Sequence, residues 1–196
     1  MNAVGSTAPP LRVSQWFNTV APISLNTLRG RVVVVHAFQM LCPGCVAQAL
    51  PQAMNMHRLL PSSEVAVLGL HTVFEHHEAM GPNALKAFLH EYRIAFPVGV
   101  DLPVMDHPVP TTMQAYGLRG TPSLVVVDRS GIVRLNHFGL MDDLQLGVLL
   151  GRLLSETTPE SVEPTAADRE RPIFASELPV ACTDVQCVIP EQRTIA

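Results

Sequence analysis

The sequence predicts an α/β sandwich, with a mixed central β-sheet and helices on both of its faces. Short apolar runs of strand length alternate along the chain with segments of helical periodicity. Near the end of this pattern, two strands follow one another through a turn at residues 128–131, which favours an antiparallel hairpin. Strands joined through helices favour parallel pairing, so the sheet should contain both orientations.

The predicted elements begin with a short helical turn at residues 25–30, which ends at a glycine. A buried strand follows at residues 31–38, because this run is rich in β-branched residues. Residues 45–60 keep helical spacing, and Pro51 should kink that helix because proline lacks the N–H of the helical ladder. The remaining elements expected are strand 64–70, helix 83–92, strand 95–100, helix 111–116, strands 123–127 and 132–137, and helix 142–154.

The last helix should cover the sheet with Leu144, Val148 and Leu149. Beyond this helix the chain becomes polar, contains proline and loses its periodicity, which is typical of a linker or a loosely attached tail. We therefore expect an N-terminal extension at residues 1–24, one domain at residues 25–154, and a linker with a cysteine-containing tail at residues 155–196.

The composition is that of a globular protein, with 47% hydrophobic and 15% charged residues among 196. A net charge of −4 and the lack of any basic run argue against a nucleic-acid partner. No apolar run reaches the roughly 18 residues of a membrane span, and the N-terminus does not resemble a secretion signal. We expect a cytoplasmic protein, in which the four cysteines are catalytic or metal-binding rather than structural.

Two cysteines, Cys42 and Cys45, lie directly after the first buried strand and are separated by a proline and a glycine. A thiol attacks as its thiolate, and the amides at a helix N-terminus stabilise that anion. Cys42 occupies this place, and Cys45 lies one turn later, where it can resolve a mixed disulfide. The order of strand, CPGC and helix predicts a redox dithiol. The structural alternative is half of a zinc site completed by Cys182 and Cys187.

The stretch RVVVVHAF before CPGC, together with GTPS before LVVVD, resembles the thioredoxin superfamily. Within it, the resemblance is to the redoxin branch of TlpA-like thiol–disulfide oxidoreductases and peroxiredoxins, and it covers residues 25–154. It implies a thioredoxin-like sandwich, with an inserted strand–helix unit between the dithiol and Thr121. It also implies exchange of electrons with protein disulfides and an unidentified thiol donor, without a cofactor.

In that family a cis-proline faces the dithiol, and Thr121-Pro122 matches its motif. Such a bond would leave the backbone of Thr121 free to pair with a substrate peptide. Pro43 and Gly44, between the two cysteines, are the other expected substrate contacts. The alternative is a trans proline that only opens a strand. Leu41 stands where thioredoxins carry tryptophan, so the partner surface should differ.

His36 lies six residues before Cys42, at the position where thioredoxins carry a buried acid. A histidine that titrates near neutrality could take a proton from Cys45 and so release the product. A core histidine without a catalytic role is the alternative interpretation.

A peroxiredoxin-like thiol peroxidase that uses Cys42 is the second function the resemblance allows. Peroxiredoxins carry a threonine three residues before this cysteine, and Gln39 stands there. The position of their arginine is held by Pro122, although Arg119 lies close enough in sequence to substitute for it. Without donors aimed at the developing oxyanion, attack on peroxide has little catalytic help.

The stretch HTVFEHHE follows the second buried strand and combines imidazole with carboxylate groups. A solvated polar loop is the favoured interpretation, and a divalent metal site is the alternative. The weak metal candidates are His71, Glu75, His76 and His77, and Glu78 ends the same stretch. A thioredoxin-fold module that binds a metal or a partner without catalysis is therefore a third hypothesis.

The tail carries a second pair, Cys182 and Cys187, close enough in sequence for a small-loop disulfide. One interpretation is a structural pair of cysteines, without a redox role, that is docked against the domain. The other is a secondary redox pair that carries electrons to and from the CPGC dithiol, because tethering raises the effective thiol concentration to roughly millimolar.

Overall fold

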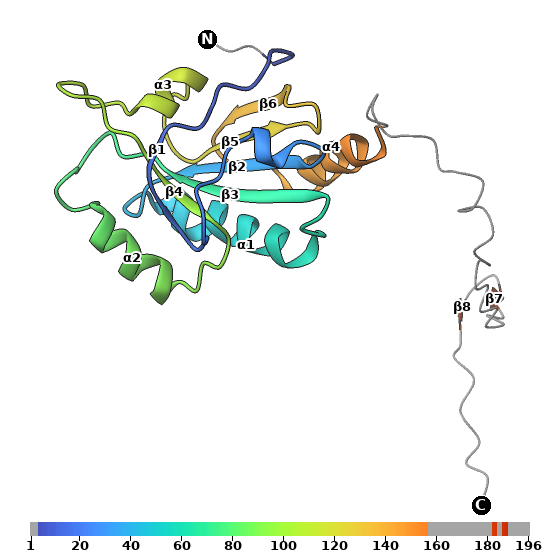
Figure 1. Ribbon diagram of the computed structural model, residues 1–196. Coiled ribbons are helices and arrows are strands. Elements are labelled where there is room, and N and C mark those ends of the chain that lie inside the picture. Colours follow the sequence, from blue (N-terminus) through green and yellow to red (C-terminus); the bar gives the residue numbers. More distant parts are fainter. Residues whose placement is uncertain (1–3, 157–181, 184–185, 188–196) are drawn as a thin grey trace, which may run out of the picture. The chain divides into compact units, whose positions relative to one another are not determined.

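The computed structural model describes residues 4–156, 182–183 and 186–187. Its main feature is a six-stranded sheet in the order β1-β4-β3-β2-β5-β6 (Figure 1). β2, β3 and β4 are parallel, and β1, β5 and β6 each pair antiparallel with their neighbours. The strands are β1 (Val13–Phe17), β2 (Val32–Phe38), β3 (Val65–His71), β4 (Val98–Asp101), β5 (Ser123–Val127) and β6 (Val133–Phe138). The predicted mixed sheet is thus confirmed.

The helices cover both faces of this sheet. They are η1 (Asn26–Leu28), η2 (Cys45–Ala49), α1 (Leu50–Leu59), α2 (Pro82–Glu91), α3 (Thr111–Tyr116) and α4 (Asp143–Ser155). The chain from the dithiol to Thr121 contains β3, α2, β4 and α3, so the additional strand–helix unit expected there is present. Within the described part of the chain, none of the helices combines the length and apolar character that crossing a membrane requires.

Strand β1 lies inside the segment that the sequence assigned to an N-terminal extension. It forms one edge of the sheet and pairs antiparallel with β4, with Trp16 opposite Gly99. The pairing of β1 with β4 requires a glycine at position 99, because a Cβ there would lie 2.8 Å from a methyl group of Val13. The sequence VSQWF is short and only half-buried, so it lacks the apolar run by which the other strands were predicted.

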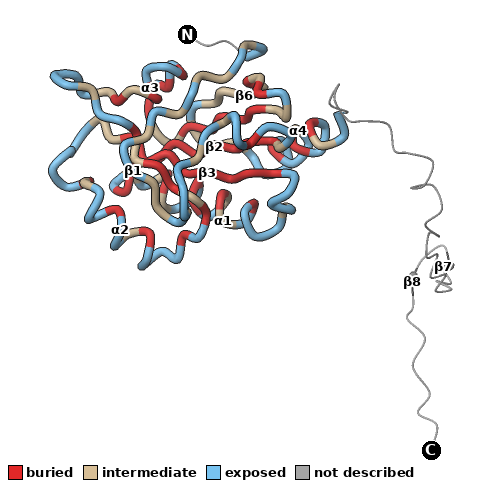
Figure 2. The backbone as a smooth tube through the Cα atoms, viewed as in Figure 1, coloured by how far each residue is buried: buried red, intermediate tan, exposed pale blue. Residues whose placement is uncertain are grey.

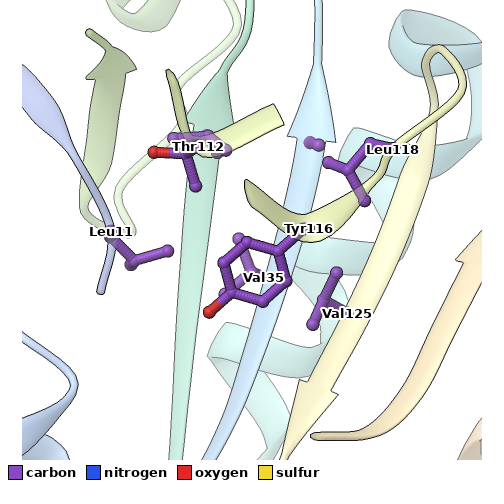
Figure 3. Close-up of a pocket in the computed structure, with 8 residues that line it drawn as sticks. Leu11, Val35, Thr112, Tyr116, Leu118 and Val125 are labelled. Atoms are coloured by element: carbon purple, nitrogen blue, oxygen red, sulfur yellow. The ribbon is translucent and has the colours of Figure 1, made fainter. Parts of the chain in front are cut away.

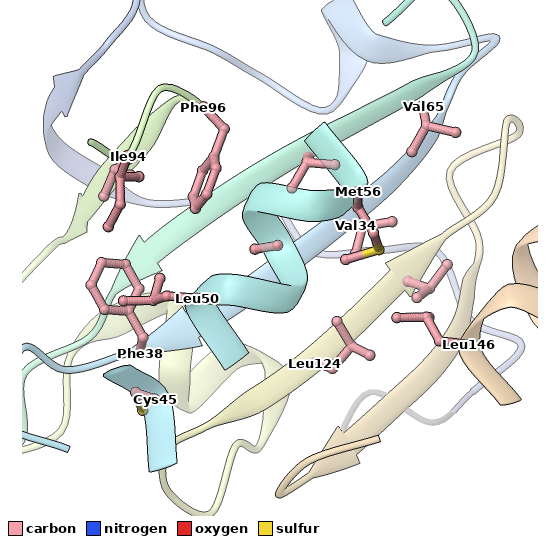
Figure 4. Close-up of a cluster of buried hydrophobic side chains, with 14 of the residues drawn as sticks. Val34, Phe38, Cys45, Leu50, Met56, Val65, Ile94, Phe96, Leu124 and Leu146 are labelled. Atoms are coloured by element: carbon pink, nitrogen blue, oxygen red, sulfur yellow. The ribbon is translucent and has the colours of Figure 1, made fainter. Parts of the chain in front are cut away.

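Two apolar clusters form the core, one on each face of the sheet, and β2 and β3 between them are buried along their whole length (Figure 2). Successive side chains of a strand point to opposite faces. Val34 and Phe38 accordingly belong to one cluster, and Val33 and Val35 belong to the other. The first cluster includes Leu50, Ala53 and Met56 of α1, Leu85 and Leu89 of α2, Leu146, Leu150 and Leu153 of α4, and Cys45 (Figure 4).

The helix after the dithiol begins with a wide π-turn, η2, and continues as α1. Pro51 lies at the second position of α1 and cannot donate the hydrogen bond that would tighten the preceding turn. A π-bulge of this kind often occurs at functional sites. The kink that the sequence predicts at Pro51 therefore takes the form of an expanded turn between Cys45 and Leu50.

Helix α4 covers the sheet as predicted with Leu149, which is half-buried against the first cluster, but not with Leu144 and Val148. Leu144 and Val148 are 76% and 56% exposed, whereas Leu146, Leu150 and Leu153 are buried. The helix has apolar residues on more than one face, so periodicity alone could not choose between them. Its start is fixed by Asp142, whose carboxylate accepts hydrogen bonds from the backbone N–H groups of Leu144 and Gln145.

A small apolar cavity of about 10 Å³ lies under α3 (Figure 3). It is lined by Leu11, Val35, Ala37, Leu70, Thr112, Tyr116, Leu118 and Val125. The hydroxyl of Tyr116 donates to the carbonyl oxygen of Pro9 at 2.7 Å, and burial raises the pKa of this phenol. The space is no larger than one water molecule and has no polar surface to hold it, so it is a packing defect rather than a ligand site.

The chain divides into two units, residues 1–159 and 160–196. In the second unit, β7 (Cys182–Thr183) and β8 (Gln186–Cys187) pair antiparallel, with Cys182 directly opposite Cys187. Ser155 and Glu156, at the start of the predicted linker, end helix α4, and the remaining residues of the linker and tail lie outside the described residues.

Candidate functional site

The dithiol lies just beyond the C-terminal end of β2, at the start of the helix that includes η2 and α1. Cys42 and Cys45 form a disulfide with their Cα atoms 5.2 Å apart. Cys42 is half-buried, whereas Cys45 is completely buried beside Phe38 and Leu50 (Figure 4). Of the two cysteines, only Cys42 is accessible to a partner.

The backbone around Cys42 favours negative charge on its sulfur. The N–H of Cys45 donates to Cys42 Sγ at 3.2 Å. Pro43 begins the helix, so Cys42 also lies at the positive end of the helix dipole. The N–H of Cys42 itself donates to the carbonyl oxygen of Gln39 at 3.2 Å, which fixes the turn between β2 and the helix. After reduction, these groups stabilise a thiolate at Cys42.

The loop before β5 brings Thr121 and Pro122 against the dithiol. Their peptide bond is cis, as the resemblance implied. The carbonyl oxygen of Thr121 lies 3.5 Å from Cys42 Sγ. A Cβ added to Gly44 would lie 3.7 Å from Cδ of Pro122, so the proline ring faces that glycine. Residues from the two motifs, which are almost 80 positions apart, therefore meet at one site, and Pro43 lies exposed beside them.

His36 lies in the middle of β2, on the sheet face that carries Cys45. Its neighbours on that face, Val34 and Phe38, belong to the same apolar cluster as the buried sulfur. Burial lowers the pKa of His36 to about 4, and its Nε2 has no hydrogen-bond partner in the structure. The premise that this histidine titrates near neutrality is therefore wrong, because desolvation disfavours the imidazolium ion.

The buried histidine should make the stability of the fold pH-dependent. In the unfolded chain His36 has a pKa near 6.5, so it gains a proton on unfolding between pH 6.5 and 4. The contribution of His36 to the free energy of unfolding is fully present above pH 6.5. It falls as the pH is lowered through this window, by about 2 kcal/mol at pH 5. We expect His36→Leu to lose less stability than the wild type when urea unfolding is compared at pH 7.5 and 5. An equal loss in the two proteins would contradict the assigned burial.

Gln39 ties the dithiol turn to the loop that follows β3. Its side chain is buried, and its Oε1 accepts a hydrogen bond from the N–H of Phe74 at 3.2 Å. Its Nε2 donates to the carboxylate of Glu75 at 3.3 Å. The residue that replaces the threonine of peroxiredoxins thus has a structural function: it fixes the position of the loop beside Cys42.

The histidine-rich stretch does not gather into a metal centre in the structure. His71 is buried against the ring of Phe38, with centroids 5.3 Å apart, and burial lowers the pKa of His71 to about 4. Glu75, His76 and His77 lie exposed in the following loop, as does Glu78. Over residues 4–156 and the described pieces of the tail, no group of three or more histidine, cysteine or acidic side chains could hold a metal ion.

Two exposed apolar side chains lie at the site: Leu41, which the sequence linked to the partner surface, and Phe138, which it did not single out. Leu41, next to Cys42, is 58% exposed, and Phe138, at the end of β6, is 47% exposed. The guanidinium of Arg119 lies over the Phe138 ring, 5.2 Å from its centroid. Phe138 reaches the site only through the pairing of β6 with β5, in which it lies opposite Ser123. The hairpin of these two strands was predicted, but its register, which shifts between Val126 and Val127, was not.

Comparison with known proteins agrees with this geometry. Residues 4–136 match the AhpC/TSA family. The chain is 30% identical over 177 residues to protein DipZ of Mycobacterium bovis, an alignment that covers 82% of this chain. The same alignment covers 24% of DipZ, so the chain spans about a quarter of the length of the curated relatives it matches.

Two crystal structures are much more similar to this chain. One is a thioredoxin-like superfamily protein, 55% identical with a TM-score of 0.77, which matches 80% of this chain and 100% of its own. The other is a thiol-disulfide isomerase from Corynebacterium glutamicum, 53% identical with a TM-score of 0.74, which matches 76% of this chain and 98% of its own. Since the family match also covers more than half of the sequence, the chain belongs to the AhpC/TSA family and has a thioredoxin-like fold with an oxidoreductase-type disulfide, Cys42–Cys45.

Proposed function

We propose that the protein exchanges electrons with disulfides of other proteins through its CPGC dithiol. The observation that supports this most directly is the position of Cys42 Sγ, which is partly accessible, accepts the N–H of Cys45 and lies 3.5 Å from the carbonyl oxygen of Thr121. A protein thiolate in this place can attack a sulfur that approaches along the cis-proline loop. The relative from Corynebacterium glutamicum, described as a thiol-disulfide isomerase, supports the same chemistry.

In the reducing direction, the Cys42 thiolate attacks one sulfur of a client disulfide. The client S–S bond breaks, its other sulfur leaves as a thiolate and takes a proton, and a mixed disulfide joins Cys42 to the client. Cys45 then attacks Cys42 Sγ, which releases the second client thiolate and forms the Cys42–Cys45 disulfide. The client gains two electrons and the dithiol loses two, and a thiol donor restores the starting state. The same steps in reverse oxidise a client.

The second step requires Cys45 to lose its proton inside the core. The sequence suggested His36 as the acceptor, but burial lowers its pKa to about 4, which makes it a weak base for the Cys45 proton. The client thiolate that leaves in this step is the group that can take the proton, so the exchange balances without His36. The backbone of Thr121, with Pro122, Pro43 and Gly44 around it, would hold the client peptide as an added strand.

A thiol peroxidase is the less well supported function. The polar groups of Gln39 are engaged by Phe74 and Glu75, and the guanidinium of Arg119 is placed over Phe138. Neither side chain is therefore aimed at a peroxide oxygen beside Cys42, as oxyanion stabilisation would require.

The experiment that separates the two functions starts from fully reduced protein. We expect the Cys42–Cys45 disulfide to form rapidly with a model protein disulfide and slowly with hydrogen peroxide. Quenched thiol labelling under the same conditions measures both rates. The peroxide reaction should resemble that of a simple thiol, because no donor assists it. Fast oxidation by peroxide together with slow exchange would reject the oxidoreductase and favour the peroxidase.

A further inference from the structure

Arg119 is a positive charge held in a defined place beside the dithiol. Its guanidinium carbon lies 5.2 Å from the centroid of the Phe138 ring, within the range of a cation–π contact. In residues 4–156, the ion pairs join His90 to Glu91, and Arg134 to Asp128 and Glu156. None of them engages Arg119, so this charge is stacked on an aromatic ring and is not neutralised by a carboxylate of that region.

The backbone fixes this stacked pair next to the reacting sulfur. A Cβ at Gly120 would lie 2.9 Å from Cε2 of Phe138, so only glycine lets the ring pack on the cis-proline loop. The N–H of Gly139, which follows Phe138, donates to the carbonyl oxygen of Pro122 at 2.8 Å. Arg119 is two residues from Thr121, and two residues of extended chain span at most about 7 Å. Its side chain is therefore within reach of a peptide whose cysteine has joined Cys42.

The surroundings of the sulfur combine apolar surface with this positive charge, while the loop beside Cys42 carries the carboxylate of Glu75. Leu41 and Phe138 are both about half exposed; Leu41 precedes Cys42, and Phe138, at the end of β6, packs against Gly120 of the cis-proline loop. The chain as a whole has a net charge of −4, so its long-range field repels acidic partners. A carboxylate near the client cysteine would meet a favourable charge only at a local feature such as Arg119.

We propose that Arg119 and Phe138 form a subsite that selects client disulfides in which an acidic side chain lies within a few residues of the reacting cysteine. Arg119 pairs with the client carboxylate, and Phe138 holds the guanidinium plane while it covers an apolar part of the client. This specificity rests on the proposed exchange with protein disulfides, and it adds a client class to that function.

The test uses two peptide disulfides that are identical except for glutamate or glutamine two residues from the cysteine. With the full-length wild type we expect kcat/KM to be roughly twofold to fivefold higher for the glutamate peptide, the size of an exposed ion pair. The preference should shrink at high salt, since exposed charges are screened. Arg119→Gln should turn over both peptides equally, and Arg119→Lys should keep only part of the preference because lysine lacks the planar group that stacks on Phe138.

A matched control removes another positive charge far from the site. The control is Arg58→Gln. Arg58 lies 16 residues after Cys42, at the far end of α1, so the two residues are about 24 Å apart along the helix axis. This variant should keep the full preference for the glutamate peptide. An equal rate for both peptides in the wild type, or a preference that persists in Arg119→Gln, would overturn the subsite alone. Failure of the wild type to turn over either peptide would overturn the proposed function and the subsite with it.

Discussion

Replacement of Cys42 by serine is expected to reduce turnover of a protein disulfide to the uncatalysed rate, a loss of roughly 10³-fold or more. The hydroxyl that replaces the thiol is not ionised at neutral pH, so the stabilising N–H of Cys45 has no thiolate to act on. Cys45→Ser should behave differently, because Cys42 can still attack but nothing resolves the product. This variant should accumulate a mixed disulfide with the client, which is detectable as a mass increase that disappears with excess thiol.

The comparison between the two variants carries more information than either loss of activity. Both remove one sulfur and both prevent formation of the Cys42–Cys45 disulfide, so a general effect on stability should appear in both. Trapping of a client by Cys45→Ser and not by Cys42→Ser would assign the nucleophile to the accessible sulfur. Trapping by Cys42→Ser instead would mean that the buried Cys45 reacts first, which contradicts the proposed order of steps.

The parts of the site that could be predicted are those that a short stretch of sequence determines. The strand before Cys42 is a mainly apolar run and the helix begins soon after it, so the position of Cys42 at a helix N-terminus is local information. The family motif then placed Thr121 and Pro122 opposite the dithiol, and the distance of 3.5 Å from Cys42 Sγ to the Thr121 oxygen agrees with it.

The parts that could not be predicted depend on packing between distant segments. The contact of Arg119 with Phe138 requires the register of β5 and β6, and the link from Gln39 to Glu75 requires the parallel pairing of β2 with β3. The low pKa of His36 follows from complete burial, which no sequence pattern measures. The choice of the buried face of α4 likewise depends on which apolar stripe meets the sheet.

Phe38→Ala is expected to lower the free energy of unfolding by about 3–5 kcal/mol, as for other buried aromatic residues. The ring is completely buried at the end of β2, packs on His71 and Phe88, and lies close to the backbone of Gly69. A Cβ at Gly69 would lie 3.2 Å from the Phe38 ring. Loss of the ring removes apolar burial and leaves a cavity that the surrounding strands cannot fill. Urea unfolding of the reduced proteins measures the difference.

The matched variant is Phe88→Ala on α2, whose ring stacks with Phe38 but is only half-buried. We expect it to lose about 1–2 kcal/mol, because part of its surface is already in water in the folded state. Equal losses would show that Phe38 has no special place in the core. A much larger loss at Phe38 would mean that the apolar cluster that surrounds Cys45 also stabilises the sheet. The resolving thiol would then lie in the most stable part of the fold, while Cys42 lies at its edge, where a client can reach it.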